Sequence, residues 1–130
     1  MCKKKNLMGI KTADADLLIT NIIKGIENVK GLDISILDLR AIDNTVSSYF
    51  IVCEGTSNTH VAAIVNAIHK TVSKELHEKP FHTEGLEVAE WVLLDYVNVV
   101  VHVFQKHIRE KYSIEALWGD AEVTSIASNY

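Results

Sequence analysis

The residues most able to do chemistry form a short glycine-containing turn between an apolar segment and a helical pattern. Gly55, Thr56 and Ser57 follow an apolar run that ends at Cys53, and a stripe of apolar residues at helical spacing begins shortly after them. Backbone N–H groups at the start of a helix bind anions well, and a glycine turn lets a phosphate approach them closely. The turn is therefore one candidate site, for a nucleotide or another phosphate compound.

This turn looks like the Gly-Ser turn of the nucleotidyltransferase superfamily, whose members also need paired carboxylates shortly downstream. Those carboxylates hold two metal ions about the phosphoryl group that is transferred. Positions 58–74 contain neither aspartate nor glutamate. Asp14 and Asp16 precede the turn, and helical residues two apart do not share a face. We therefore expect at most a catalytically empty version of that fold, with no enzymatic activity and no cofactor.

The sequence gives weaker evidence for two other kinds of site, a serine–histidine nucleophile and a metal site of histidines or cysteines. Ser57 and His60 are close in sequence, but Ser57 is expected to cap the following helix, and no nucleophile elbow surrounds it. The six histidines include no pair four residues apart on a predicted helix, which is the spacing that builds a zinc face. Cys2 and Cys53 are too few for a four-thiolate site, and Cys53 is expected to be buried and inert. We predict no metal site.

Composition narrows the class of protein. The chain has 130 residues, 48% of them hydrophobic and 23% charged, which is typical of one globular domain. The formal net charge of −4 argues against direct, sequence-specific nucleic-acid binding, although docking on a protein inside a nucleoprotein particle stays open. No signal peptide and no apolar run of about twenty residues are present, so we expect no membrane contact and a cytoplasmic location.

Hydrophobic periodicity predicts how these residues are positioned. A first helix is expected to begin at Thr12 or Asp14 and to stop at Gly31, and a second helix to run from its cap Ser57 towards Pro80. Strands are expected at 33–38, 48–54, 81–83, 91–96 and 99–104, with a turn at 43–45 and a broken helix at 108–118. This order indicates an α+β fold, a mixed β-sheet with helices packed on it.

The segments 91–96 and 99–104 read as a hairpin joined by Val97 and Asn98, with Asn98 able to adopt positive φ. Alternation places Trp91 and Asp95 on one side of the hairpin, yet apolar residues occupy both sides. A sheet of this kind must be covered on both faces. On the second face the cover is either the terminal helix of the chain itself or a protein partner, for which Trp91 would be the anchor.

Several segments, in this order and spacing, resemble the ribosomal silencing factor family, also called Iojap-related. They are Gly55-Thr56-Ser57-x-x-His60, Glu84-Gly85, Trp91-Val92-Leu93-Leu94-Asp95, Val99-Val100-Val101-His102-Val103-Phe104 and Tyr112 with Leu117-Trp118. The resemblance spans roughly residues 12–118. It implies a nucleotidyltransferase-like α+β domain without nucleotidyl transfer, preceded by a flexible tail at 1–11 and followed by a polar tail at 119–130.

The resemblance also implies a function. Members of the family are expected to bind ribosomal protein fourteen of the large subunit, on the face that meets the small subunit. Occupying that face blocks joining of the subunits and lowers translation when nutrients are short. The open alternatives are a nucleotide- or phosphate-binding enzyme that uses the Gly55 turn, and a homodimer off the ribosome that buries the same hairpin face.

The docking residues follow from the family motifs. The family often has Gly-Asp at the hairpin turn, where this chain has Val97-Asn98, so an acidic turn residue is missing here. The candidates that the resemblance implies for partner binding are Trp91, Asp95, Asn98, Tyr112 and Trp118.

Overall fold

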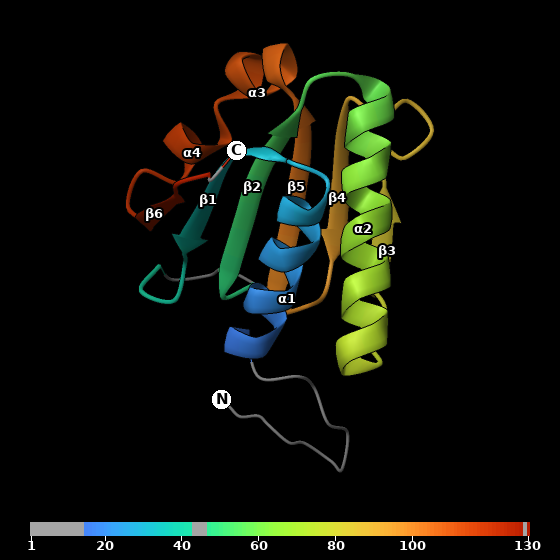
Figure 1. Ribbon diagram of the computed structural model, residues 1–130. Helices are drawn as coiled ribbons and strands as arrows, with labels where there is room; N and C mark the ends of the chain where they lie inside the picture. Colours follow the sequence, from blue (N-terminus) through green and yellow to red (C-terminus); the bar gives the residue numbers. More distant parts are fainter. Residues whose placement is uncertain (1–14, 43–46, 129) are drawn as a thin grey trace.

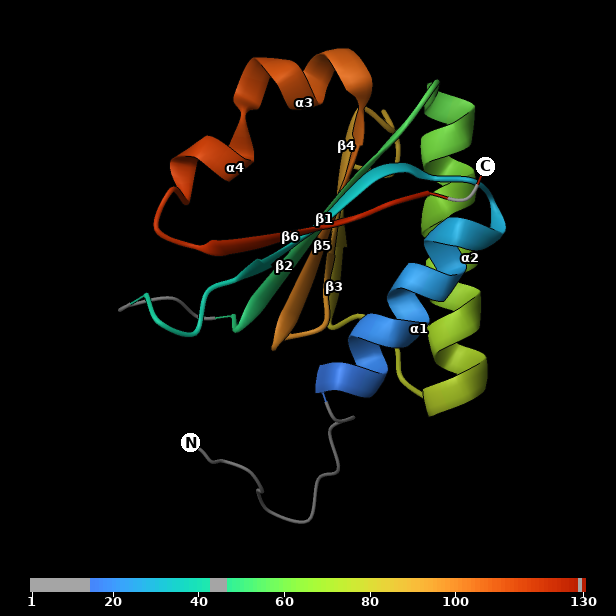
Figure 2. The same cartoon turned by 60° about the vertical axis from the view of Figure 1, so that its left-hand side comes forward.

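The computed structural model describes residues 15–42, 47–128 and 130. Within these residues one six-stranded sheet has the order β3-β4-β5-β2-β1-β6. In chain order the elements are α1 (Ala15–Asn28), β1 (Leu32–Asp38), β2 (Tyr49–Gly55), α2 (Asn58–Leu76), β3 (His82–Glu84), β4 (Trp91–Asp95), β5 (Val99–Gln105), α3 (Lys106–Tyr112), α4 (Ile114–Leu117) and β6 (Glu122–Ile126). Figures 1 and 2 show α1 and α2 on one side of the sheet and α3 and α4 on the other.

The sheet is mixed, as the sequence predicts. β2 and β5 pair in parallel, with Tyr49 opposite Val99 and Gly55 opposite Gln105. The other neighbouring strands pair antiparallel. β2 and β5 are the two central strands and are apolar along most of their length, because both of their faces are covered. The α+β fold with a mixed sheet is confirmed.

The first layer consists of α1 and α2, packed against each other and against the sheet. The predicted apolar stripe of α2 is buried, and Ser57 caps the helix with its hydroxyl, which accepts a hydrogen bond from the His60 backbone N–H. The two helices approach closely at Gly25, where an added Cβ would lie 2.9 Å from the carbonyl oxygen of Ala67. The core of this layer includes Leu18, Ile22, Ile26, Ile51, Val61, Ile64, Ile68, Val92, Leu94, Val101 and Val103.

The second layer is smaller and covers only part of the opposite face. α3 and α4 follow directly from β5 and lie over one end of the sheet (Figure 2). Their core residue Ile114 joins a separate buried cluster with Leu37, Leu39, Val52 and Phe104. The apolar residues on both sides of the hairpin predicted a cover on this second face, and α3 and α4 supply part of it. Phe50, Trp91, Leu93 and Asp95 on the same face stay half-buried.

The C-terminal segment corrects one expectation. Residues 119–130 were expected to form a polar tail, but Glu122–Ile126 form strand β6, which pairs antiparallel with β1 from Asp38 to Ile34. Most side chains of β6 are exposed, so the strand has no apolar alternation that a sequence reading could detect. The expected N-terminal tail at 1–11, the helix start at Thr12 or Asp14 and the turn at 43–45 lie outside the described residues.

The hairpin of β4 and β5 is confirmed, but its turn differs from the expectation. Positive φ falls on Val97, at 77°, and not on Asn98. The Asn98 N–H donates to the carbonyl of Tyr96 at 3.0 Å, which closes a γ-turn centred on Val97. The Asp95 carboxylate accepts a hydrogen bond from the Val97 N–H at 2.7 Å and fixes the start of this turn. A β-branched residue at positive φ is strained.

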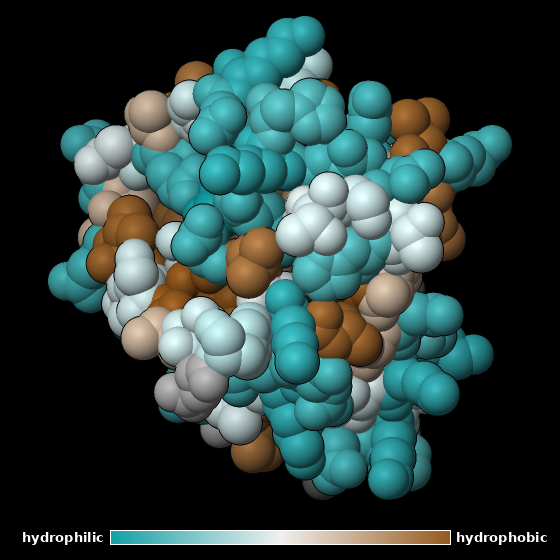
Figure 3. All heavy atoms as spheres, turned by 45° about the horizontal axis from the view of Figure 1, so that its top comes forward, coloured by the Kyte–Doolittle hydropathy of each residue, from teal (hydrophilic) through white to brown (hydrophobic). Residues whose placement is uncertain are grey.

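The molecular surface on the side of α1 and α2 is mostly hydrophilic. With the top of the molecule tilted forward, apolar side chains there form small patches separated by polar ones (Figure 3). In the described part of the chain, no helix has the length and apolar character needed to cross a membrane.

The strain at Val97 leads to the first prediction. Replacing Val97 with glycine should raise the free energy of unfolding by about 1 kcal/mol, because left-handed backbone costs a β-branched residue more than the added chain entropy costs glycine. The Val97 side chain is 48% exposed, so little burial is lost. Urea unfolding measures the change.

Asn98→Gly is the matched control, since Asn98 has no positive φ to relieve. It should leave stability unchanged or lower it. Equal losses in both variants would contradict the strain argument.

Candidate functional site

The turn at Gly55–Ser57 is held by side chains of the chain itself. The Thr56 N–H donates to Nδ1 of His60 at 2.9 Å, and Nε2 of the same ring lies 2.8 Å from the carbonyl oxygen of Val29. Since a carbonyl can only accept, the ring proton is on Nε2. His60 therefore links the start of α2 to the chain just after α1, and the motif Gly55-Thr56-Ser57-x-x-His60 acts as a structural link between the helices.

Similar contacts occupy three of the backbone donors that a phosphate could use at the start of α2. The backbone N–H groups of Thr56, Thr59 and His60 donate to His60 Nδ1, to the Asn58 side chain and to the Ser57 hydroxyl, respectively. A helix N-terminus binds an anion through such groups when they are free. Here they are used within the turn, which weakens the phosphate-site alternative.

The opposite face of the sheet carries a continuous group of rings, which we call the aromatic face. The Trp91 ring stacks on Phe104 with centroids 4.9 Å apart and meets Tyr112 at 5.0 Å. These contacts join β4, β5 and α3 at one point. The aromatic face consists of Phe50, Trp91, His102, Phe104, Tyr112 and Trp118.

His102 lies inside the aromatic face and is 4% exposed. Its Nδ1 accepts a hydrogen bond from the Trp91 indole N–H at 3.1 Å, and Phe50 packs edge-on against it with centroids 4.6 Å apart. Trp118 in turn packs edge-on against Phe50 at 5.6 Å. Nε2 of His102 is buried and has no hydrogen-bond partner among the residues that the structure describes. Burial lowers the pKa of His102 to about 4, because charging a desolvated ring is costly, although the carboxylate of Glu115 acts in the opposite direction.

The candidate docking residues fall into two groups. Trp91, Tyr112 and Trp118 belong to the aromatic face, where Trp91 is half-buried and Tyr112 is 46% exposed. Asp95 and Asn98 lie at the hairpin turn instead, at the other end of β4 from Trp91. There they have backbone roles, since the Asn98 carbonyl also accepts from the N–H of Ser48 and of Tyr49.

A shallow groove runs beside Trp91 and Tyr112. It has a volume of about 250 Å³, and Val88 and Ile108 give it apolar walls while Lys111 and Glu90 line it as charged residues. Val88 is 62% exposed. An open groove with an aromatic floor can receive an apolar or long aliphatic side chain from another protein.

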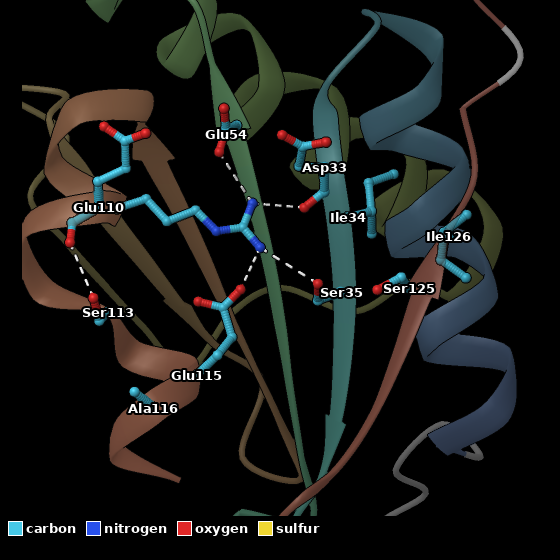
Figure 4. Close-up of a pocket in the computed structure, with 11 residues that line it drawn as sticks. Asp33, Ile34, Ser35, Glu54, Glu110, Ser113, Glu115, Ala116, Ser125 and Ile126 are labelled. Carbon is cyan, nitrogen blue, oxygen red and sulfur yellow. Dashed lines mark hydrogen bonds and ion pairs between the residues drawn. The ribbon is translucent and has the colours of Figure 1, made fainter. Parts of the chain in front are cut away.

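Arg109 fixes the position of α3 and α4 over this face. Its guanidinium donates to the backbone carbonyl of Asp33 at 2.6 Å, to Glu54 at 3.2 Å and to Ser35 at 3.4 Å, and it also bonds the Glu115 carboxylate (Figure 4). The Arg109 side chain is only 11% exposed. One residue thus connects α3 to β1, β2 and α4.

The cleft around Arg109 has a volume of about 560 Å³, but its charged groups bond one another. Glu54 and Glu115 both pair with the guanidinium, so the cleft presents no free cation to a phosphate. Burial raises the pKa of Glu54 above its ordinary value, while the nearby Arg109 charge lowers it. We interpret this cleft as a structural ion-pair network.

Sequence reasoning missed Arg109, Glu54 and Glu115 as positioning residues. The one available signal was a charged residue, Glu54, at the end of an otherwise apolar strand, which requires a partner. The partner lies 55 positions away, and no spacing rule could identify it. His102 was not identified from the sequence as a partner of Trp91. Cys53 is buried, as predicted, and burial raises the pKa of its thiol to about 12.

Comparison with known proteins places these features in a family context. A family model described as ribosomal silencing factor during starvation matches residues 12–129. A ribosomal silencing factor from Bacillus subtilis is 42% identical over 94 residues, covering 72% of this chain and 78% of that protein. Another, from Halalkalibacterium halodurans, is 34% identical over 109 residues, covering 84% and 92%. A crystal structure of a Chromobacterium violaceum protein superposes with a TM-score of 0.77 at 34% identity, covering 82% of this chain and 88% of that one.

The ion-pair network leads to a second prediction. Arg109→Met should lower the free energy of unfolding by about 3 kcal/mol, since it leaves the buried carboxylate of Glu54 and the half-buried one of Glu115 unpaired. Adding Glu54→Leu should recover part of the loss, because it removes one of them. Urea unfolding measures both variants.

The control for Arg109 is Arg40→Met, which breaks a surface pair with Asp38 whose atoms lie 2.7 Å apart. Exposed pairs contribute little, so the unfolding midpoint of this variant should stay close to that of the wild type. A comparable loss in both arginine variants would contradict a special role for Arg109.

The environment of His102 leads to a third prediction, on pH. Its pKa is about 4 when folded and near its ordinary value of 6.5 when unfolded. Between those values the unfolded chain binds more protons, so stability falls as the pH is lowered. From about pH 7.5 to pH 5, His102 alone should cost about 2 kcal/mol.

Urea unfolding of the wild type and of His102→Phe across this pH range isolates that contribution. The difference in free energy between the two proteins should change in favour of the phenylalanine variant as the pH falls. Parallel stability curves would show that His102 is not desolvated as described.

Proposed function

The chain belongs to the ribosomal silencing factor family, and on that premise we propose that it binds the large ribosomal subunit through ribosomal protein fourteen. The bound protein covers the surface that meets the small subunit and blocks joining of the two subunits. Translation falls as a result when nutrients are limiting. This activity would take place in the cytoplasm, where the subunits join.

The half-covered aromatic face is the observation that carries this proposal. The first layer of helices buries the apolar side chains of β4 and β5 on its side of the sheet, whereas α3 and α4 leave Phe50, Trp91 and Leu93 half-buried on the other side. Half-buried tryptophan and tyrosine rings next to a groove are typical of the residues that dominate binding energy in protein interfaces. We therefore assign the docking surface to Trp91, Tyr112 and Trp118, with the groove beside them.

The charge of the chain supports a protein partner that is itself bound to RNA. Such a partner carries basic residues, because RNA phosphates require them. The chain has a formal net charge of −4, and Glu90, which lines the groove, is exposed. Charges of opposite sign at the rim of an interface speed encounter and suppress wrong partners. Asp95 and Asn98 act in this picture by holding the hairpin turn.

The enzymatic alternative has little support in the site. Two-metal phosphoryl transfer needs carboxylates near the Gly55 turn, and positions 58–74 supply none. The backbone N–H groups of Thr56, Thr59 and His60 are bonded within the chain. We propose a regulator without catalytic activity; the likeness of the β2–α2 unit to nucleotidyltransferases stays a prediction, and so does a homodimer off the ribosome.

The fourth prediction concerns subunit joining. Purified large subunits preincubated with the protein should fail to form complete ribosomes when small subunits are added, because the joining surface is covered. Sucrose-gradient sedimentation separates joined particles from free subunits and shows which fraction carries the protein. Unchanged joining at saturating protein would contradict the proposed function.

The fifth prediction locates the binding energy. Trp91→Ala should weaken binding to large subunits by roughly thirtyfold, the equivalent of about 2 kcal/mol for loss of a central tryptophan. Lys74→Ala, on the exposed side of α2, is the matched control and should bind like the wild type. Co-sedimentation at several protein concentrations measures both dissociation constants.

Thermal unfolding of the same variants shows whether they are folded at the temperature of the binding assay. A folded Trp91→Ala protein that binds as tightly as the wild type would remove Trp91 from the docking surface.

A further inference from the structure

We infer that His102 is a positioning residue of the docking surface, which acts by holding the Trp91 indole in the orientation that a partner binds. The inference rests on the proposed function for the identity of the partner. It adds His102 to the residues on which docking depends, although this side chain is nearly inaccessible and acts through Trp91.

The first step is the hydrogen bond between the two rings. The Trp91 N–H donates to His102 Nδ1 at 3.1 Å, and the two ring centroids lie 6.0 Å apart. Trp91 also stacks on Phe104, so the indole is fixed by one flat contact and one polar contact. Ring contacts of this kind still allow an indole flipped about its Cβ–Cγ bond, and the hydrogen bond to His102 selects the orientation in which the N–H points at the imidazole.

The second step is the state of the imidazole. Because Nδ1 accepts from Trp91, the ring carries its proton on Nε2. That Nε2 is buried, and no acceptor in the described chain bonds it. Nε2 is one of the two ring atoms farthest from the backbone, and the side chain stands on the aromatic face between Phe50 and Phe104. Tryptophan is therefore the one polar partner that the structure shows for this ring.

The third step is energetic. A buried donor without a partner lowers stability, and an apolar ring of similar shape at position 102 would avoid that loss. His102 is surrounded by rings and by buried Val52 across the strand pair, an environment that favours phenylalanine. Histidine at this position thus lowers stability, and what it supplies in return is the acceptor for Trp91.

The melting temperature and the ribosome binding of a His102 variant together distinguish a positioning role from a merely structural one. Replacing His102 with phenylalanine should change the melting temperature at about pH 7.5 little, because it removes the unpaired Nε2–H but also takes the acceptor from the half-buried Trp91 N–H. The same variant should bind large subunits about tenfold more weakly, since the indole loses its fixed orientation. A structural histidine would instead show a loss of stability.

A double-mutant cycle tests whether the effect passes through the indole N–H. Trp91→Phe keeps an aromatic ring but has no N–H to donate. Co-sedimentation with large subunits is measured for wild type, His102→Phe, Trp91→Phe and the double variant. We expect the double variant to bind no more weakly than Trp91→Phe alone, because the interaction that His102 provides is already absent.

A spectroscopic measurement reports the orientation without the ribosome. In protein labelled with ¹⁵N, the indole N–H resonance of Trp91, identified by its absence from Trp91→Phe, should shift strongly in His102→Phe. In His102→Asn, whose side-chain oxygen can accept near the position of Nδ1, the resonance and the binding should return towards wild-type values. Asparagine also removes ring volume, so recovery of binding despite lower stability would support positioning.

Three outcomes would overturn the inference. They are wild-type binding by folded His102→Phe, additive losses in the double variant, and an indole resonance that does not respond to position 102. If the wild type itself fails to bind large subunits, the proposed function falls and with it the docking role, while the resonance still shows whether His102 orients Trp91.

Discussion

Arg109 reaches from α3 to two strands of the sheet and to α4, and the shape of the aromatic face depends on that reach. Its bonds to Glu54 and Glu115 hold charges that would each be costly to bury alone. A network of this kind does little for net stability compared with an apolar core, but its directional bonds allow only one placement of the helices. Tyr112 and Trp118, which follow Arg109 in the chain, take their positions beside Trp91 and Phe50 from it.

The two faces of the sheet have different roles: one stabilises the fold, and the other presents half-exposed rings. The face under α1 and α2 is a conventional apolar core, closed by the near contact of the helices at Gly25 and by the His60 link at the start of α2. That side carries most of the folding free energy, because it buries most of the apolar side chains. The aromatic face can then hold half-exposed rings and the unpaired Nε2 of His102 without loss of the fold.

Local patterns predicted most of the fold, and the failures have physical reasons. The spacing of Val61 and Ile64 and the alternation around Trp91 each depend on one element, so the sequence was sufficient to place α2 and the hairpin. The bond between Glu54 and Arg109 and the pairing of β6 with β1 depend on residues far apart in the chain. The left-handed residue of the turn was assigned to Asn98 from its preference, whereas the geometry of the γ-turn places it at Val97.

The pairing of β6 with β1 also affects the newly made chain, because it decides when the backbone edge of β1 is covered. β1 is rich in apolar residues, including Ile34, Ile36 and Leu37, and until β6 arrives one of its backbone edges is open. An apolar strand with an open edge is a template for aggregation. β6 pairs with that edge and becomes the new edge of the sheet. Its side chains are mostly exposed and include Glu122, Thr124 and Ser125, so the new edge is less prone to aggregation. A newly made chain therefore exposes this edge until β6 has been synthesised, and a chain truncated after Leu117 would expose it permanently.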